Sequence, residues 1–131
     1  MWYMWSLTAD DLRANTTGII LSLVVALILH LVEEVTTGFR KRFPLGDLSI
    51  PIFVAINVAF YAFCFVTLVL SAREGELATP FAWVFAVTMV LNGLGHVGMM
   101  ALRRQYFPGG LTAVLLLGLS VHLMLHLLGL T

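Results

Sequence analysis

Residues 17–38 decide the fold class of this chain, and they read TGIILSLVVALILHLVEEVTTG. No charged side chain occurs before Leu29, and the stretch supplies the roughly 20 mostly apolar residues that a membrane-spanning helix needs. Three ionisable residues, His30, Glu33 and Glu34, then follow within the same stretch. The pattern predicts a spanning helix with an unusually polar end.

Three further apolar stretches follow, at about residues 50–71, 79–102 and 110–130. The connectors between the four stretches are short and polar, and they contain turn-forming residues such as Pro44, Gly46 and Gly75. The sequence therefore predicts an all-α fold. We expect a single transmembrane domain over residues 1–131, arranged as an integral membrane four-helix bundle with short loops.

The composition excludes several classes of protein. Of the 131 residues, 60% are hydrophobic and 11% are charged, against about 25% charged in an ordinary globular domain. A soluble domain of this length could not bury so much apolar surface, which excludes a soluble enzyme and a disordered tail. The net charge is zero, so nothing predicts a nucleic-acid partner, and the lone Cys64 excludes an internal disulfide. The lipid bilayer is the expected partner.

The basic residues predict the orientation of the bundle. Five of the seven lie in the first and third connectors: Arg40, Lys41, Arg42, Arg103 and Arg104. Cytoplasmic loops of membrane proteins carry an excess of lysine and arginine, so these two connectors are expected to face the cytoplasm. Both termini would then lie on the outer side, as an even number of spans requires.

Several ionisable or strongly polar residues lie inside the predicted spans. They are His30, Glu33, Glu34, Asn57, Asn92, His96, His122 and His126. Placing a carboxylate at mid-membrane costs roughly 2.5–3.5 kcal/mol, so such residues persist when they face the bundle interior and find a partner. Each is therefore a candidate functional residue.

Helical spacing brings these residues together. Glu33 and Glu34 follow His30 by three and four residues, and Asn92 precedes His96 by four, so each set shares one helix face. A rise of about 1.5 Å per residue places at least one polar residue of every helix in the cytoplasmic half or near the midplane. His126 lies farther from that level.

Imidazole and carboxylate groups are ligands of Zn²⁺ and Fe²⁺, and helix bundles build metal sites from such side chains on facing helices. We therefore predict a divalent transition metal site. Its candidate ligands are His30, Glu33 or Glu34, His96 and, as a fourth, His122. Asn57, Asn92 or the remaining glutamate would then orient the ligands.

Three short motifs occur in order along the chain: residues 30–34 read H-x-x-E-E, residues 92–96 read N-x-x-x-H, and residues 106–109 read Y-x-P-G. Together they resemble the motifs of the HXXEE family of small prokaryotic membrane proteins. The resemblance covers nearly the whole chain and implies functional weight for the motif residues, Tyr106 included. It also implies a prokaryotic cytoplasmic membrane as the location, but it implies little about a reaction. His122 and His126 fall outside the three motifs.

Together these features favour a metal-dependent membrane enzyme, hydrolytic or oxidative, that acts on a lipophilic substrate. Such a substrate is expected because it must reach a site within the bilayer. The glutamate that does not bind the metal, for which Glu34 is a candidate, would act as general base. Asn92 or Tyr106 would contact the substrate.

Two other functions fit part of the pattern. Histidines on facing membrane helices can ligate a b-type haem, although this leaves the glutamates unexplained. Chains of glutamate and histidine also form proton or cation pathways, for which a homo-oligomer would be expected because four spans give few walls for a pore. The purely structural interpretation is a buried hydrogen-bond network that only holds the helices together.

Overall fold

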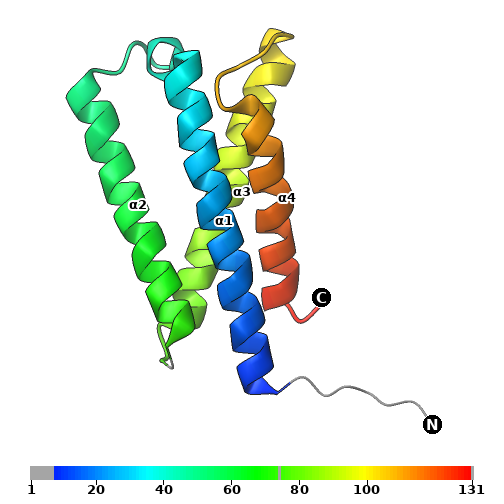
Figure 1. The fold of residues 1–131 in the computed structure, drawn as a ribbon. Coiled ribbons are helices and arrows are strands. Elements are labelled where there is room, and N and C mark those ends of the chain that lie inside the picture. The colour runs from blue at the N-terminus through cyan, green and yellow to red at the C-terminus, as the bar shows by residue number, and fades with distance from the viewer. Residues whose placement is uncertain (1–7, 74, 131) are drawn as a thin grey trace.

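The computed structural model describes residues 8–73 and 75–130 and contains no strand among them. Its elements are α1 (Ala9–Thr37), the short 3₁₀ helix η1 (Phe39–Arg42), α2 (Ile50–Ala72), α3 (Ala78–Arg103) and α4 (Gly110–Leu127). The four α-helices run alternately up and down along the chain (Figure 1). All four are long and apolar enough to cross a membrane, which confirms the predicted four-helix membrane fold.

Helix α1 begins eight residues before the apolar stretch that predicted it. Thr8 and Asp11 form a reciprocal cap, in which the Asp11 amide donates to the Thr8 hydroxyl and the Thr8 amide donates to the Asp11 carboxylate. This capping box satisfies amides that the first turn leaves without partners. The helix ends at Gly38, whose φ of 80° is the left-handed conformation that glycine adopts most readily.

The core of the bundle is formed mainly by α1, α3 and α4. Ile20, Leu23, Phe85, Met89 and Leu116 are fully buried there. Large apolar side chains elsewhere on these helices point outward and are about half exposed. An apolar exterior around an apolar core is what a bundle surrounded by lipid requires.

Helix α2 packs less closely than the others. In an apolar 18-residue stretch of α2, 11% of the residues are buried, against 28–33% in the corresponding stretches of the other three helices. The Tyr61 hydroxyl donates to the Leu27 carbonyl oxygen at 2.7 Å, and the Thr17 hydroxyl donates to the Ser71 carbonyl oxygen at 2.9 Å. These bonds join α2 to α1, and the two helices diverge toward the end of the bundle that carries η1 (Figure 1).

The first and third connectors lie at the same end of the bundle (Figure 1). That end therefore carries η1 with Arg40–Arg42, and it also carries Arg103 and Arg104. The described chain begins and ends at the opposite end. The two basic connectors thus share a side, and the placement of that side in the cytoplasm stays a prediction.

Candidate metal centre

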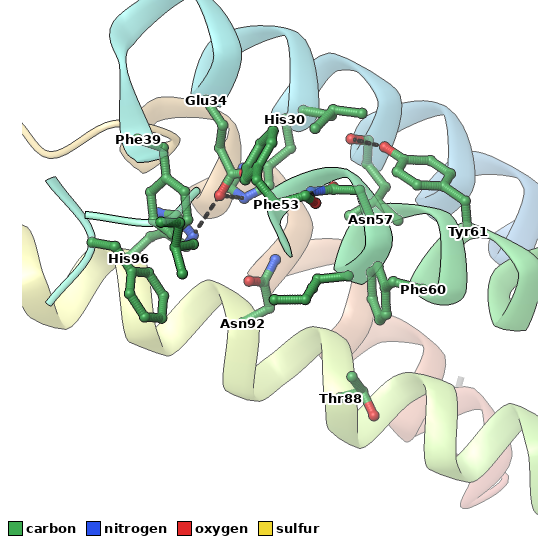
Figure 2. Close-up of a pocket in the computed structure, with 15 residues that line it drawn as sticks. His30, Glu34, Phe39, Phe53, Asn57, Phe60, Tyr61, Thr88, Asn92 and His96 are labelled. Carbon is green, nitrogen blue, oxygen red and sulfur yellow. Dashed lines mark hydrogen bonds and ion pairs between the residues drawn. The ribbon is translucent and has the colours of Figure 1, made fainter. Parts of the chain in front are cut away.

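Three buried side chains, His30, Glu34 and His96, converge near the end of the bundle that carries the basic connectors (Figure 2). Their exposed fractions are 2%, 8% and 5%. The Glu34 Oε1 atom lies 3.5 Å from His30 Nε2 and 3.2 Å from His96 Nε2. One ligand atom from each residue lies within 4.8 Å of the other two. The structure thus joins one ligand pair on α1 with a histidine from α3.

The helical repeat explains why Glu34, and not Glu33, joins His30. Successive residues of an α-helix are rotated by about 100°, so Glu34 lies about 40° from His30 and Glu33 about 60° away on the other side. The His30 and Glu34 side chains therefore share the face toward α3. Glu33 is turned toward the start of α4.

The tautomer of His96 is fixed by the loop before α4. His96 Nδ1 lies 2.8 Å from the carbonyl oxygen of Pro108. A carbonyl oxygen can only accept a hydrogen bond, so Nδ1 carries the proton. In the neutral ring Nε2 then presents a lone pair, and it presents it toward Glu34.

The tautomer of His30 follows from a chain of two hydrogen bonds. The Thr112 hydroxyl donates to Glu33 Oε2 at 2.5 Å. The oxygen of this hydroxyl, Thr112 Oγ1, lies 2.8 Å from His30 Nδ1. Because the single hydroxyl proton points to the carboxylate, the threonine oxygen accepts from His30 Nδ1–H. His30 Nε2 is again the atom with the lone pair.

When both imidazole rings are neutral, three acceptor atoms therefore meet without a donor between them. Within the described chain His30 Nε2 is buried and has no hydrogen-bond partner, which is rare for a buried polar atom. Ligands bound at about 2.0–2.1 Å in a tetrahedral metal site lie about 3.3 Å from one another. The distances of 3.2 and 3.5 Å from Glu34 Oε1 match that spacing.

Glu33, expected as an alternative ligand or as the general base, has a different environment. Its carboxylate accepts hydrogen bonds from the Tyr106 hydroxyl, from the backbone amides of Leu111 and Thr112, and from the Thr112 hydroxyl. These amides belong to the first turn of α4, where the helix dipole favours a negative charge. Glu33 therefore caps α4 from outside the helix and is not directed at the cluster.

Tyr106 also differs from its expected role of contacting substrate. Its hydroxyl donates to Glu33 Oε1 at 2.6 Å, and Tyr106 does not line the cavity next to the cluster. Burial and the hydrogen bond to the Glu33 carboxylate raise the pKa of the Tyr106 hydroxyl above its ordinary value. The phenol thus remains a proton donor to Glu33 near neutral pH.

Gly109 lets the loop approach both imidazoles. Its φ is 81°, and a Cβ atom there would lie 2.7 Å from His30 Cε1 and 2.8 Å from His96 Cε1. No larger residue fits at this distance. Together with Pro108 and Tyr106, Gly109 explains the Y-x-P-G motif, whose residues contact the histidine and glutamate of H-x-x-E-E and the histidine of N-x-x-x-H.

Aromatic side chains cover the cluster on the connector side. The ring centroids of Phe39 and Phe107 lie 5.2 and 5.6 Å from that of His96. Phe107 is buried, and Phe39 belongs to η1. These rings pack against His96, whereas a groove lined by Arg40 and Lys41 reaches Glu34 from the same connector.

The cluster opens on its other side into an apolar cavity of about 300 Å³ between α1, α2 and α3 (Figure 2). Asn92, expected to contact substrate, lines this cavity, and so does Asn57 from α2. Glu34 is the one carboxylate in the lining. The cavity therefore gives an apolar molecule access to the cluster from within the bundle.

His122, expected as a fourth ligand, does not join the cluster. It is exposed on α4 and lines a separate groove with His126 and with residues from the first half of α1. His126 Nε2 lies 3.0 Å from the Thr16 hydroxyl oxygen, near the opposite end of the bundle. Depth along α4 was a poor guide to His122 because the face on which it lies points away from the other ligands.

Two contributions to the site have no signal in the sequence. Thr112, which orients His30, is an ordinary threonine in the first turn of a predicted span. The acceptor for His96 is a backbone carbonyl, that of Pro108, so no side chain marks it. The Y-x-P-G motif indicated that the loop matters, but not how.

The fold and the cluster define a class: a four-helix membrane protein with a buried two-histidine, one-carboxylate site. The chain belongs to the HXXEE family, because the model of this family, described as proteins of unknown function with an HXXEE motif, matches residues 21–123. All three motifs lie within the matched residues, whereas His126 lies outside them. No curated protein and no solved structure matches the chain.

Proposed function

We propose that this protein is a metal-dependent membrane enzyme that acts on a lipophilic substrate. His30, Glu34 and His96 hold one divalent transition metal, Zn²⁺ or Fe²⁺, and the apolar cavity beside them receives the substrate. The proposal keeps His30 and His96 as ligands. It assigns the carboxylate ligand to Glu34 and assigns Glu33 to the support of α4.

One observation carries the proposal: His30 Nε2, His96 Nε2 and a Glu34 carboxylate oxygen converge in a buried space, where the neutral imidazoles offer lone pairs and no donor. Burying polar acceptors with no partner is costly. A dication satisfies all three at once and offsets the desolvation of the glutamate. The hydrogen bonds from His30 to Thr112 and from His96 to Pro108 are the outer contacts that orient histidine ligands in metal sites.

A metal held by two histidines and one carboxylate, with open coordination positions, can support two classes of reaction. Bound Zn²⁺ supplies Lewis acidity toward a carbonyl group and toward water, whereas bound Fe²⁺ activates dioxygen. The residues of this chain orient the metal and position the substrate. Because Glu33 is fully engaged with α4, a hydrolytic reaction would depend on the metal alone to activate water.

The cluster does not favour the haem alternative. Axial haem ligands approach the iron from opposite faces of a flat macrocycle. Here the rings of His30 and His96 are perpendicular neighbours with centroids 4.6 Å apart, and both Nε2 atoms meet at one carboxylate oxygen. The other two histidines lie on a different part of the bundle.

Elemental analysis of the purified protein tests the proposal. We expect about one zinc or iron per chain, and we expect His30→Ala, Glu34→Gln and His96→Ala each to lose it, because each removes one of only three protein ligands. An absorption spectrum of the same sample detects haem. The identity of the metal separates the hydrolytic from the oxidative class.

The matched control is His122→Ala, which removes an exposed histidine from the same bundle and should leave the metal content unchanged. A wild-type protein purified without chelators that holds no stoichiometric metal, even after incubation with Zn²⁺ or Fe²⁺, contradicts the proposal. So does a His30→Ala protein that keeps its full metal content.

A further inference from the structure

The cavity beside the cluster is long enough to hold part of a hydrocarbon chain. It passes from Phe39 and Phe43 beside the cluster to Asn92 and Thr88, which precede His96 by four and eight residues on α3. At about 1.5 Å per residue, the part of the cavity between His96 and Thr88 extends about 12 Å along α3. Tyr61, whose hydroxyl binds the Leu27 carbonyl oxygen, lies at the far part of the lining and joins α1 to α2 there.

The cavity is also small. Its volume of about 300 Å³ lies at the lower end of the range for small-molecule pockets. Its walls away from the cluster are apolar, with Leu27, Ile56 and Phe60 among them. This space suits one hydrocarbon chain better than two chains side by side.

Two carboxamides interrupt the apolar wall, about one helical turn from the cluster (Figure 2). The Asn57 amide nitrogen donates to the Phe53 carbonyl oxygen at 2.9 Å, which leaves the carboxamide oxygen as an acceptor. Asn92 makes no hydrogen bond within the described chain, so its donor and its acceptor both face the cavity. Polar groups in an apolar cavity are costly without a partner, which points to a ligand that supplies one.

The cavity is reachable from the lipid side of the bundle. Ile56 lines it and is 55% exposed, so neighbouring helices do not close this wall of the cavity. Helix α2 is also the least closely packed helix and diverges from α1 at this level (Figure 1). A chain that lies in the bilayer can therefore enter beside α2 without passing through water.

We propose that the substrate is an amphiphile with a single hydrocarbon chain. The chain enters beside α2 and lies along α3, away from the cluster. A group that both donates and accepts hydrogen bonds, such as a hydroxyl or an amide, lies between Asn57 and Asn92. The reacting atom is next to that group, at the cluster. The reaction at the cluster rests on the proposed function, whereas the binding of the chain does not.

Photo-crosslinking in lipid nanodiscs tests the chain. The first probe is a long-chain N-acyl ethanolamine with a diazirine halfway along the chain, and the second is a phosphatidylcholine that carries the same tagged chain. We expect the single-chain probe to label residues of the cavity wall, mapped by mass spectrometry on the unaltered protein. The phospholipid is expected to label outward-facing residues of the helices instead.

Two matched variants locate the binding site. Ile56→Trp fills the cavity and should abolish labelling of its wall, whereas Val58→Trp, two residues away on the lipid-facing side of α2, should not. The double variant Asn57→Leu with Asn92→Leu should weaken binding of the N-acyl ethanolamine by about 2- to 10-fold per lost hydrogen bond. It should leave the binding of a tagged long-chain hydrocarbon, which has neither donor nor acceptor, nearly unchanged.

The outcomes separate this inference from the proposed function. Chain labelling should persist in Glu34→Gln protein and after treatment with a chelator, because no ligand of the metal contacts the chain. Specific labelling without any bound metal keeps the chain site and contradicts the enzyme proposal. Bound metal together with equal labelling by both probes, or equal labelling of the Ile56→Trp and Val58→Trp proteins, overturns the chain site.

Discussion

One threonine hydroxyl connects the two halves of the H-x-x-E-E motif. Thr112 Oγ1 donates to Glu33 and accepts from His30, so it holds the proton of His30 on Nδ1. We expect Thr112→Val, which has nearly the same shape, to weaken metal binding by about 10- to 100-fold, as loss of such outer contacts does elsewhere. A competition titration against a zinc chelator measures the affinity directly.

Thr112→Ser is the control for this prediction because it keeps the hydroxyl and removes a methyl group. Its metal affinity should return to near the wild-type value. If Thr112→Val and Thr112→Ser bind metal equally well, the hydroxyl does not orient His30. In that case packing alone holds the imidazole in place.

A single added methyl group at Gly109 should also damage the site. Gly109→Ala costs about 1–2 kcal/mol for the left-handed backbone, and it forces the new Cβ against His30 and His96 at 2.7 and 2.8 Å. We expect the variant to fold less stably and to lose most of its metal. Thermal unfolding in detergent, together with elemental analysis of the folded fraction, gives both quantities.

Gly38 provides a control with the same backbone. Its φ is 80°, close to the 81° of Gly109, but a Cβ there meets nothing within 4 Å. Gly38→Ala should therefore lower the melting temperature and leave the metal content intact. Loss of metal in both variants would mean that general destabilisation, and not the contact with the imidazoles, empties the site.

At this scale the sequence indicated which residue types form the site but not the geometry of each. The burial of His30 and His96 could be inferred because histidines in apolar spans need partners. Which glutamate is the ligand could not, because both lie near His30 on the helix and the position of α4 decides between them. The role of Thr112 depends on a contact across 82 positions of the chain, and no local pattern indicates it.

At the scale of helices, the two adjacent glutamates should behave as different parts of the protein. Glu33 binds the first-turn amides of α4, so Glu33→Gln should lower the free energy of unfolding by about 1–3 kcal/mol, the range for hydrogen bonds to charged groups. Glu34→Gln should remove the metal and leave the metal-free stability nearly unchanged. Chemical denaturation of both metal-free proteins, followed by the start of α4 in hydrogen exchange, makes the comparison.

The reverse pattern would contradict this division. If Glu33→Gln empties the metal site while the stability of α4 is untouched, Glu33 acts on the metal and the cap is incidental. Hydrogen exchange at Leu111 and Thr112 is the most direct reading, because their amides donate to Glu33.

The extents of the helices could be predicted within a few residues at seven of their eight ends. Hydropathy is a reliable guide inside a span because lipid requires a continuous apolar surface. The exception is the start of α1, where the helix continues past the apolar stretch to the Thr8 cap. Such a cap lies in polar sequence, which a search for apolar runs does not detect.

For the whole molecule, the testable expectation is its direction in the membrane. Arg40–Arg42, Arg103 and Arg104 share one end of the bundle, which should face the cytoplasm. In a Cys64→Ala background, Asp47→Cys reports the first connector and Gly75→Cys the second. We expect an impermeant maleimide to label Gly75→Cys in intact cells, and Asp47→Cys only after permeabilisation.

Both positions are exposed, so each label reports sidedness and not burial. Labelling of Asp47→Cys in intact cells, with Gly75→Cys protected, would place the metal cluster near the outer leaflet. Replacement of Cys64 removes the native thiol, which is 1% exposed and otherwise a source of background.

Helix α2 contributes a wall of the cavity but no ligand, and no partner that orients a ligand. In the proposed enzyme, α2 therefore contributes to substrate binding without contributing to the metal site. Substitutions on the cavity-facing side of α2 could then admit a longer, shorter or branched molecule, while α1, α3 and α4 keep the proposed metal site unchanged. For protein engineering, α2 is therefore the helix to randomise, because a library of α2 variants would change which substrate binds and would leave the proposed metal ligands in place.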